Sequence, residues 1–248
     1  VNTYLNWRAP SKDITVGVGE TAAAAKLLAA SKAQNLNERQ SLELFTALGI
    51  DCVRSVVLTE PGQPVRMTGP FALKLLSADV LHKTDAGMVR LNVEADRVGG
   101  IAKDLLAEAA LRFPQAKVEG VLVQRMERGL AELMLGYRND AEVGPTVLLG
   151  MGGIMAELKR SFSVRLAPVS VGTAMKMIEE IAELAILRGY RNLPRGDCDA
   201  LAHAVRALSL LACIKGSTVT EAEINPLIVK AEGAGVIAVD GLVVRTSS

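Results

Sequence analysis

A lysine in the middle of an apolar run is the feature that most constrains how this chain can fold. The run FALKLL, residues 71–76, predicts a strand with apolar side chains on both faces. Successive side chains of a strand point to opposite faces, so Lys74 shares a face with Ala72 and Leu76. A buried ammonium group needs a partner, because stripping its water is costly. A phosphate would serve; the alternative is that this face is solvated at a sheet edge.

Two glycine-containing turns offer further phosphate contacts. One is TDAGMV, residues 84–89, which includes Gly87 and follows His82. The other is LGMGGI, residues 149–154, with Gly152 and Gly153. Backbone N–H groups can crowd around a phosphate where no Cβ intervenes. Neither turn matches a Walker loop or a dinucleotide fingerprint, and taken alone each fits an ordinary turn better.

Carboxylates and an amide gather near the C-terminus. The segment EINP places Glu223 and Asn225 on the same strand face, and Asp240 ends the segment GVIAVD. The two segments predict a hairpin, which would bring Asn225 and Asp240 together. Hard oxygen ligands of this kind suit Mg²⁺. An ordinary polar hairpin explains the spacing equally well.

Composition excludes several classes of partner. The chain has 248 residues, a net charge of +1 and 3% aromatic residues, so it lacks the basic, aromatic-rich footprint of a nucleic-acid-binding protein. Its apolar runs are too short to span a membrane and no signal peptide pattern is present. Three scattered cysteines without a C-x-x-C motif indicate reduced thiols in a cytoplasmic protein. The first residue is not Met, so we expect a fragment, a processed product or a trimmed chain.

The order of helices and strands favours an α+β fold over a purely parallel sheet. After an arm at residues 1–20, the pattern predicts helices at 21–33, 35–50, 96–113, 171–187 and 199–214. Asn37 and Gln40 predict a capping box for the second of these helices. The strand at 88–94 should bury Val89, Leu91 and Val93. Strands at 117–126 and 131–140 are expected to be neighbours joined by a turn at Gly129.

Seven motifs, in order between about residues 36 and 245, resemble those of the ATP-grasp subunit or domain of ADP-forming acyl-CoA synthetases, relatives of succinyl-CoA synthetase. The motifs are ALKLLSADVLHKTDAGMVRL, GVLVQRM, AELMLGYRND, GPTVLLGMGGIMAEL, VRLAPV, LRGYRNLP and EINPLIV with GVIAVDG. The resemblance implies an ATP-grasp fold, in which two α+β halves clamp a nucleotide between sheets. We expect these halves at residues 21–122 and 123–248.

The resemblance also implies a reaction and its partners. Acid, CoA and ATP are converted to acyl-CoA, ADP and phosphate with Mg²⁺, and a CoA-binding alpha subunit or fused domain supplies the CoA site and a first phosphohistidine. His82 matches a second histidine that relays the phosphoryl group, and a neutral imidazole is a competent nucleophile near neutral pH. The residues implied for the nucleotide are Lys74, Gly87, Gln124, Arg125, Met126, Glu132, Gly152, Gly153, Glu157 and Arg165. Those implied for the metal are Asn225 and Asp240, with Glu223 as an orienting residue.

Three residues depart from the family pattern: Met88 replaces a second glycine, Arg125 a glutamate and Ser161 an aspartate. They motivate an alternative, in which the chain is a nucleotide-sensing, regulatory ATP-grasp module of a fused protein acetyltransferase. A third hypothesis, an ATP-grasp ligase without a histidine relay, gives no reason for the LHKTD loop. Since Lys74, His82 and the metal pair are present, an active enzyme part is the favoured interpretation.

Overall fold

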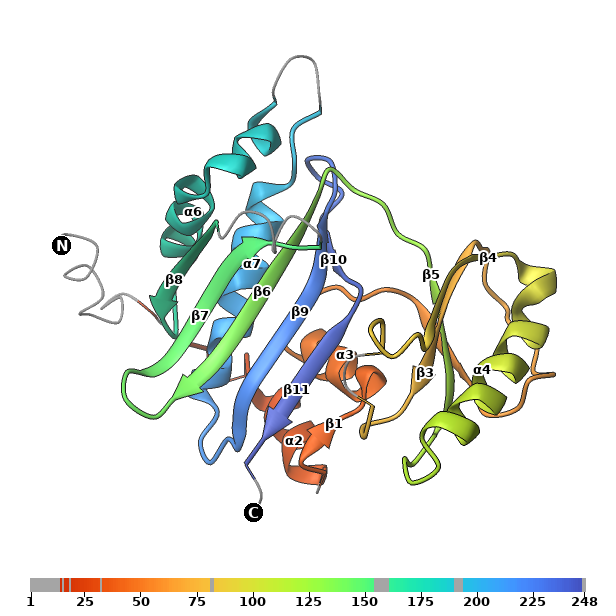
Figure 1. Cartoon of the computed structure of the whole chain (residues 1–248). Helices are drawn as coiled ribbons and strands as arrows, with labels where there is room; N and C mark the ends of the chain where they lie inside the picture. Colours follow the sequence, from red (N-terminus) through yellow and green to blue (C-terminus); the bar gives the residue numbers. More distant parts are fainter. Residues whose placement is uncertain are drawn as a thin grey trace. The chain divides into compact units, whose positions relative to one another are not determined.

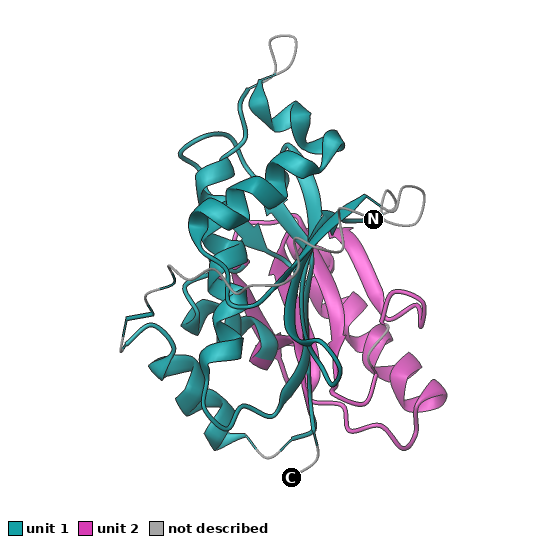
Figure 2. Cartoon of the chain, turned by 90° about the vertical axis from the view of Figure 1, so that its left-hand side faces the viewer, with its two compact units in different colours: residues 1–34, 41–52, 128–248 teal, residues 35–40, 53–127 magenta. Residues whose placement is uncertain are grey.

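The computed structural model describes residues 14, 16–17, 19–31, 33–80, 83–153, 161–189 and 194–246. The chain forms two compact units, shown in two colours in Figure 2. Unit 1 comprises Val1–Gln34, Ser41–Cys52 and Arg128–Ser248, and unit 2 comprises Asn35–Gln40 and Val53–Glu127. Each unit is an antiparallel sheet with helices, which is the α+β architecture expected from the sequence.

Unit 2 is built on a four-stranded antiparallel sheet in the order β2-β5-β3-β4. Its strands are β2 (Ser55–Leu58), β3 (Phe71–Leu76), β4 (Val89–Val93) and β5 (Gly120–Arg125). Helix α4 (Val98–Arg112) follows a 3-10 turn at Ala95–Arg97 and packs on one face of the sheet. The core of this packing is apolar side chains of the helix and all four strands, namely Leu58, Phe71, Leu73, Val93, Val98, Ala102, Leu105, Val121 and Val123.

The edge strand β4 differs from its predicted alternation. Leu91 was expected in the core but is 58% exposed. The ladder slips between β3 and β4, where Phe71 pairs with Val93 but Leu73 pairs with Arg90. One extra residue on β4 is accommodated by Asn92, whose φ of 55° lies in the left-handed region. This bulge turns Leu91 to solvent, an outcome that an alternating pattern cannot reveal.

Unit 1 contains the larger sheet, with antiparallel strands in the order β11-β9-β6-β7-β8 (Figure 1). The strands are β6 (Ala131–Asp140), β7 (Gly144–Met151), β8 (Phe162–Leu166), β9 (Val219–Val229), β10 (Val236–Ala238) and β11 (Gly241–Arg245). The long strand β9 pairs with β6 on one side and with β10 and β11 on the other. The C-terminal hairpin predicted from the sequence is thereby confirmed.

The helices of unit 1 begin and end close to the predicted residues. They are α2 (Ala22–Ala30), α6 (Val171–Glu180) and α7 (Cys198–Ser209), with 3-10 segments at Ala182–Arg188 and Leu210–Cys213. Helix α7 packs against β6 and β7, and α6 against β8, on the face of the sheet that points backward in Figure 1. Helix α3 (Glu38–Ala47) has its first three residues in unit 2 and the remainder in unit 1; the two-residue strand β1 (Asn35–Leu36) precedes it.

The expectation that β5 and β6 are neighbours is wrong. Strand β5 pairs with β2 and β3, whereas β6 pairs with β7 and β9, so the two belong to different sheets. Gly129 lies beside β9, and a Cβ there would approach the Val229 carbonyl oxygen to 2.4 Å. Next along the chain, Leu130 donates its N–H to that carbonyl. The glycine therefore permits a close backbone approach and does not mark a hairpin turn.

The three cysteines are free thiols, as predicted. Burial raises the pKa of Cys52 to about 11, and burial also raises the pKa of Cys198 and Cys213. Raised values keep all three protonated and poorly nucleophilic near neutral pH. No helix among the described residues is long and apolar enough to cross a membrane.

A buried arginine ties the end of β11 to the C-terminal end of α2. The guanidinium of Arg245 donates to the carbonyls of Leu28 at 3.1 Å, Ser31 at 2.7 Å and Ala33 at 3.2 Å. Its Nε donates to the Thr218 hydroxyl at 2.8 Å. Carbonyls at a helix end have no partner within the helix, so the arginine satisfies groups that would otherwise be orphaned.

We expect Arg245→Met to lower the free energy of unfolding by about 2–4 kcal/mol, because several carbonyls lose a charged donor. For a chain of this size, that corresponds to a melting temperature roughly 5–15 °C lower. Arg138→Met is the matched control, since the Arg138 side chain is 72% exposed. Equal melting temperatures for the two variants would show that the Arg245 contacts do not stabilise the fold.

Asp197 caps α7 and also fastens the turn between β9 and β10. One carboxylate oxygen accepts from the N–H of Ala200 at 3.0 Å, and the other accepts from Gly233 and Gly235 at 2.9 Å each. The Ala200 bond does most to lower the pKa of Asp197; burial opposes this, and the Gly235 and Gly233 bonds lower the pKa further.

The folded pKa of Asp197 therefore lies below the unfolded value of about 3.9. Stability from this group is complete above the unfolded pKa and is lost as pH falls through the folded pKa. An amide has one acceptor oxygen, so Asp197→Asn should lower the melting temperature at pH 7, and the difference from wild type should shrink on acidification. The exposed Asp199→Asn is the control. A difference that stays constant down to about pH 2 would contradict the linkage.

Candidate nucleotide-binding residues

Lys74 is buried, and its partner in the structure is a carboxylate. The residue is 5% exposed on the interior strand β3, so the alternative of a solvated sheet edge is wrong. Its ammonium donates to Glu38 Oε1 at 2.7 Å, and Gln124 Nε2 donates to the same oxygen at 3.1 Å. Lys83 donates to Glu38 Oε2 at 3.0 Å. All four residues lie in unit 2.

Glu38 is the functional candidate that the sequence interpretation missed. It is the first residue of α3, directly after the capping residue Asn37. The capping box itself is confirmed, because the Gln40 N–H donates to Asn37 Oδ1 and the Asn37 N–H donates to Gln40 Oε1. Acidic residues are common in the first turn of a helix, so Glu38 did not stand out in the sequence as a functional candidate. Removing one member of such a buried ionic group costs about 3–5 kcal/mol.

The turn after His82 is compact and anchored in the core. The Gly87 N–H donates to the Thr84 carbonyl at 2.9 Å, and Gly87 has φ +67°, a value that favours glycine. Met88, which departs from the family pattern, is fully buried against Leu75 and donates its N–H to the Lys83 carbonyl at 2.7 Å. The methionine therefore fills a core position at the base of the turn.

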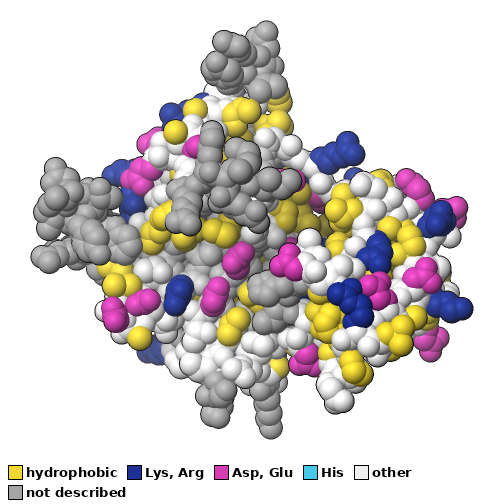
Figure 3. All heavy atoms as spheres, viewed as in Figure 1, with side chains coloured by type: hydrophobic (Ala, Val, Ile, Leu, Met, Phe, Trp, Pro, Cys, Tyr) yellow, Lys and Arg dark blue, Asp and Glu magenta, His cyan; other side chains and the backbone are white. Residues whose placement is uncertain are grey.

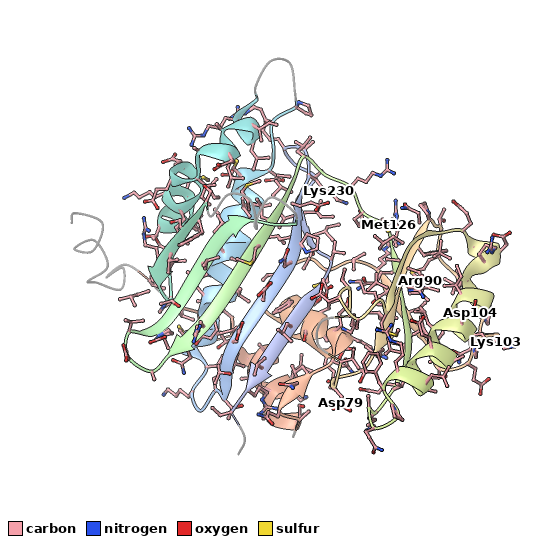
Figure 4. The ribbon with its side chains drawn as sticks, in the orientation of Figure 1. Asp79, Arg90, Lys103, Asp104, Met126 and Lys230 are labelled. Carbon is pink, nitrogen blue, oxygen red and sulfur yellow. The ribbon has the colours of Figure 1, made fainter. Side chains whose placement is uncertain are left out.

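Residues 124–126, which the resemblance implies for the nucleotide, lie at the end of β5. Gln124 is fully buried and its side chain points toward Glu38. The backbone N–H of Arg125 donates to the Arg54 carbonyl, and that of Met126, labelled in Figure 4, donates to the Pro70 carbonyl. Both N–H groups are thus engaged inside unit 2, and the Arg125 side chain is exposed.

In unit 1, the predicted residues of three strands meet at one end of the sheet. The Gly152 N–H donates to the carbonyl of Glu132 at 2.9 Å, and the Gly153 N–H approaches Asn225 Oδ1 at 3.5 Å. A Cβ at Gly152 would lie 2.7 Å from the Leu133 carbonyl carbon, so only glycine fits there. The Glu132 carboxylate also lies beside the turn, since a Cβ at Gly153 would be 3.1 Å from Glu132 Oε2. A glycine turn with free space for backbone N–H groups is the part of this arrangement that suits a phosphate.

The predicted metal residues adjoin this turn. The Asn225 side-chain amide donates to Glu223 Oε1 at 3.2 Å, and its backbone N–H donates to the Asp240 carbonyl at 3.3 Å. Asp240 Oδ1 accepts from the Gly241 N–H at 2.8 Å. The predicted approach of Asn225 and Asp240 is therefore seen in the structure. Carboxylate and amide oxygens are ligands of the kind that Mg²⁺ prefers, and the contact between Asn225 and Asp240 runs through their backbones.

A hollow of about 180 Å³ lies next to Glu223 on the same sheet. Gly136 of β6 pairs with Glu223 of β9, and its missing side chain leaves space between Met134 and Arg138. These residues alternate with the buried Leu133, Leu135 and Tyr137, so they occupy the sheet face opposite the packed helices.

On the side seen in Figure 3, basic side chains are interspersed with acidic ones, and the coloured residues form no continuous basic patch.

Arg165 has a protein partner in the structure. Its guanidinium forms an ion pair with Glu180 of α6 and donates to the Ser163 hydroxyl at 3.2 Å. Burial opposes the charged form of Glu180, but bonds from Ser163 and Arg165 prevail and lower its pKa. Ser161, another departure, donates its hydroxyl to Glu183 at 2.6 Å. His82 and Glu157 lie outside the described residues.

We expect Gly152→Ala to weaken nucleotide binding about 10-fold or more, because the new Cβ must displace the backbone at Leu133 and shift the turn. Calorimetric titration with ADP and Mg²⁺ measures the effect. Gly172→Ala is the control: a Cβ there would have its nearest neighbour at 3.9 Å. Unchanged binding by Gly152→Ala would show that this turn does not contact the nucleotide.

A family profile described as an ATP-grasp domain matches residues 27–244. The chain is 37% identical over 168 residues to acetate–CoA ligase (ADP-forming) I of Archaeoglobus fulgidus, covering 68% of this chain and 24% of that relative. It is 31% identical over 226 residues to the beta subunit of acetate–CoA ligase (ADP-forming) I of Pyrococcus furiosus, covering 88% of this chain and 96% of the subunit.

A solved structure supports the same relationship. It is acetyl-coenzyme A synthetase 1 of Candidatus Korarchaeum cryptofilum in complex with coenzyme A and Mg-AMPPCP, with its phosphohistidine segment pointing towards the nucleotide-binding site. The TM-score is 0.75 at 26% identity, covering 90% of this chain and 100% of that chain. The present chain thus spans about a quarter of the Archaeoglobus protein but nearly all of the Pyrococcus subunit. It belongs to the family of ATP-grasp domains that includes the beta subunits of ADP-forming acetate–CoA ligases.

Proposed function

We propose that this chain is the nucleotide-binding, phosphoryl-transferring part of an ADP-forming acyl-CoA synthetase. The overall reaction converts an acid, CoA and ATP into acyl-CoA, ADP and phosphate. The observation that carries the proposal is the meeting of Glu132, Gly152, Gly153 and Asn225 at one end of a sheet, in a chain of this family. The relatives reported above are CoA ligases, and their names give no support to the regulatory alternative.

The proposed roles follow the chemistry of each group. Lys74 and the glycine turns bind nucleotide phosphates, and Gln124 to Met126 with Glu132 contact the rest of the nucleotide. Glu157 and Arg165 act near the phosphates; Arg165 would have to exchange its Glu180 partner for a phosphate oxygen. Asn225, Asp240 and Glu223 would hold Mg²⁺, which neutralises phosphate charge during transfer.

His82 is proposed as the phosphoryl acceptor within this chain. In the direction of acyl-CoA synthesis, an imidazole nitrogen attacks the γ-phosphorus of ATP, a P–N bond forms, the bond to the bridging oxygen breaks and ADP leaves. The phosphoryl group then passes to a histidine of a CoA-binding partner and on to the acid. The resulting acyl phosphate reacts with the CoA thiol and releases phosphate.

A CoA-binding alpha subunit, or a fused domain, is the proposed partner. The Pyrococcus relative is named as a beta subunit, whereas the match to this chain covers only 24% of the Archaeoglobus relative. Both arrangements imply that acid and CoA are bound largely outside these residues. The proposed setting is the cytoplasm, where acid, CoA and ATP are available.

The proposal predicts that the isolated chain binds ADP in a Mg²⁺-dependent manner but forms no acyl-CoA from acid, CoA and ATP. Asp240→Asn should remove most of the Mg²⁺ dependence, since one charged oxygen ligand is lost, while metal-free ADP affinity changes by less than about threefold. Asp140→Asn is the control on the same sheet. Calorimetry and a coupled acyl-CoA assay provide the readouts, and robust unaided synthesis would contradict the need for a partner.

The relay is tested separately with γ-labelled ATP, Mg²⁺ and a CoA-binding partner. We expect acid-labile, base-stable label on this chain, as phosphohistidine requires, and its loss in His82→Asn. The exposed His203 of α7 provides the control variant His203→Asn. Label that persists at the wild-type level in His82→Asn would remove His82 from the mechanism.

A further inference from the structure

One buried carboxylate holds two ammonium groups in unit 2. Lys74 Nζ lies 2.7 Å from Glu38 Oε1, and Lys83 Nζ lies 3.0 Å from Glu38 Oε2. The Glu38 side chain is 0% exposed, and the lysine side chains are 7% and 10% exposed. Because the two oxygens belong to one carboxylate, the two ammonium groups are necessarily neighbours.

Both lysines are held by rigid surroundings. Lys74 projects from the interior strand β3, whose neighbours are β4 and β5. Lys83 begins the turn that contains Gly87, and its carbonyl accepts the N–H of the fully buried Met88. The backbone at each lysine is therefore held by a sheet or by a turn packed in the core, and the shared Glu38 carboxylate holds the two ammonium groups next to each other.

Stabilisation of the fold does not by itself explain a buried carboxylate with two ammonium partners. Desolvating two ammonium ions and a carboxylate is expensive, and apolar residues of similar volume would fill the same space at least as well. A phosphate site, in contrast, needs adjacent cations set in advance, since fixed charges stabilise transferring phosphoryl groups without reorganisation. The Lys83 ammonium has three N–H donors, of which Glu38 takes one.

We propose that Lys83 is a second phosphate-binding lysine beside Lys74, and that Glu38 is the positioning residue that sets both ammonium groups toward one nucleotide phosphate. Lys83 also adjoins His82 in the sequence, so the cation would accompany the proposed phosphoryl acceptor. The inference rests on the proposed function, and it adds two residues to the site.

The test separates phosphate recognition from general damage by comparing ADP with adenosine, which has no phosphate. For the full chain with Mg²⁺, the measured quantity is the adenosine Kd divided by the ADP Kd. We expect Lys83→Gln and Glu38→Gln each to lower this ratio about 10-fold or more, because a charged hydrogen bond to phosphate is lost. The adenosine Kd itself should stay within about twofold of the wild type.

The double variant reports whether the two residues act together. If Glu38 acts through the lysines, Glu38→Gln with Lys83→Gln should be much less damaging than the product of the single effects. The controls are Lys103→Gln and Glu108→Gln on α4; Lys103 is exposed and labelled in Figure 4, and Glu108 bridges Arg90 and Arg112 at the surface. Both controls should keep the wild-type ratio.

An unchanged ratio in Lys83→Gln overturns the inference, as does a parallel loss of ADP and adenosine affinity. If the effects of Glu38→Gln and Lys83→Gln on this ratio multiply in the double variant, Glu38 is not a positioning residue. Should Glu38→Gln fail to show a cooperative melting transition, the more exposed Lys83→Gln decides the outcome alone. A wild-type chain that binds no ADP contradicts the proposed function, whereas normal ADP binding with an unchanged ratio in Lys83→Gln contradicts only this inference.

Discussion

The buried carboxylate of Glu38 is the constraint on which the architecture of unit 2 most depends. Its partners Lys74, Lys83 and Gln124 lie 36, 45 and 86 residues away in the sequence. One charged group thus joins the start of α3, the interior of β3, the turn before β4 and the end of β5. A misplaced partner would leave a charge buried without compensation, so these four segments must assemble together.

The same interaction answers why a lysine occupies an apolar strand. The sequence placed Lys74 on a strand face with Ala72 and Leu76, but it left open whether that face is buried or solvated at a sheet edge. The structure decides for burial, because β3 is an interior strand. The sequence could not identify the partner, because Glu38 is distant in sequence and an acid at a helix start is unremarkable. Where a partner is local, prediction succeeds: the Asn37 and Gln40 capping box was read from three-residue spacing and is present.

The errors elsewhere have the same origin. The patterns of β5 and β6 each predict a strand correctly, but only tertiary pairing decides that the two strands belong to separate sheets. Leu91 is exposed because one residue, Asn92, adopts a positive φ and shifts the alternation. In unit 1 the hairpin of β9 with β10 and β11 was predictable, since its strands are adjacent in the chain, and it places Asn225 beside Asp240.

Two of the three departures from the family pattern have local contacts in the structure that explain them, and nothing in the structure explains Arg125. Where the family has a second glycine, Met88 packs its buried side chain against Leu75. Its backbone N–H donates to the Lys83 carbonyl and stabilises the turn. Ser161 gives its hydroxyl to Glu183. Core packing of Met88 therefore holds the backbone at Lys83, which the proposed phosphate-binding role of that lysine requires. Met88 is one of the three departures that suggested a regulatory module, and its place in the core gives it a structural role that does not depend on that alternative.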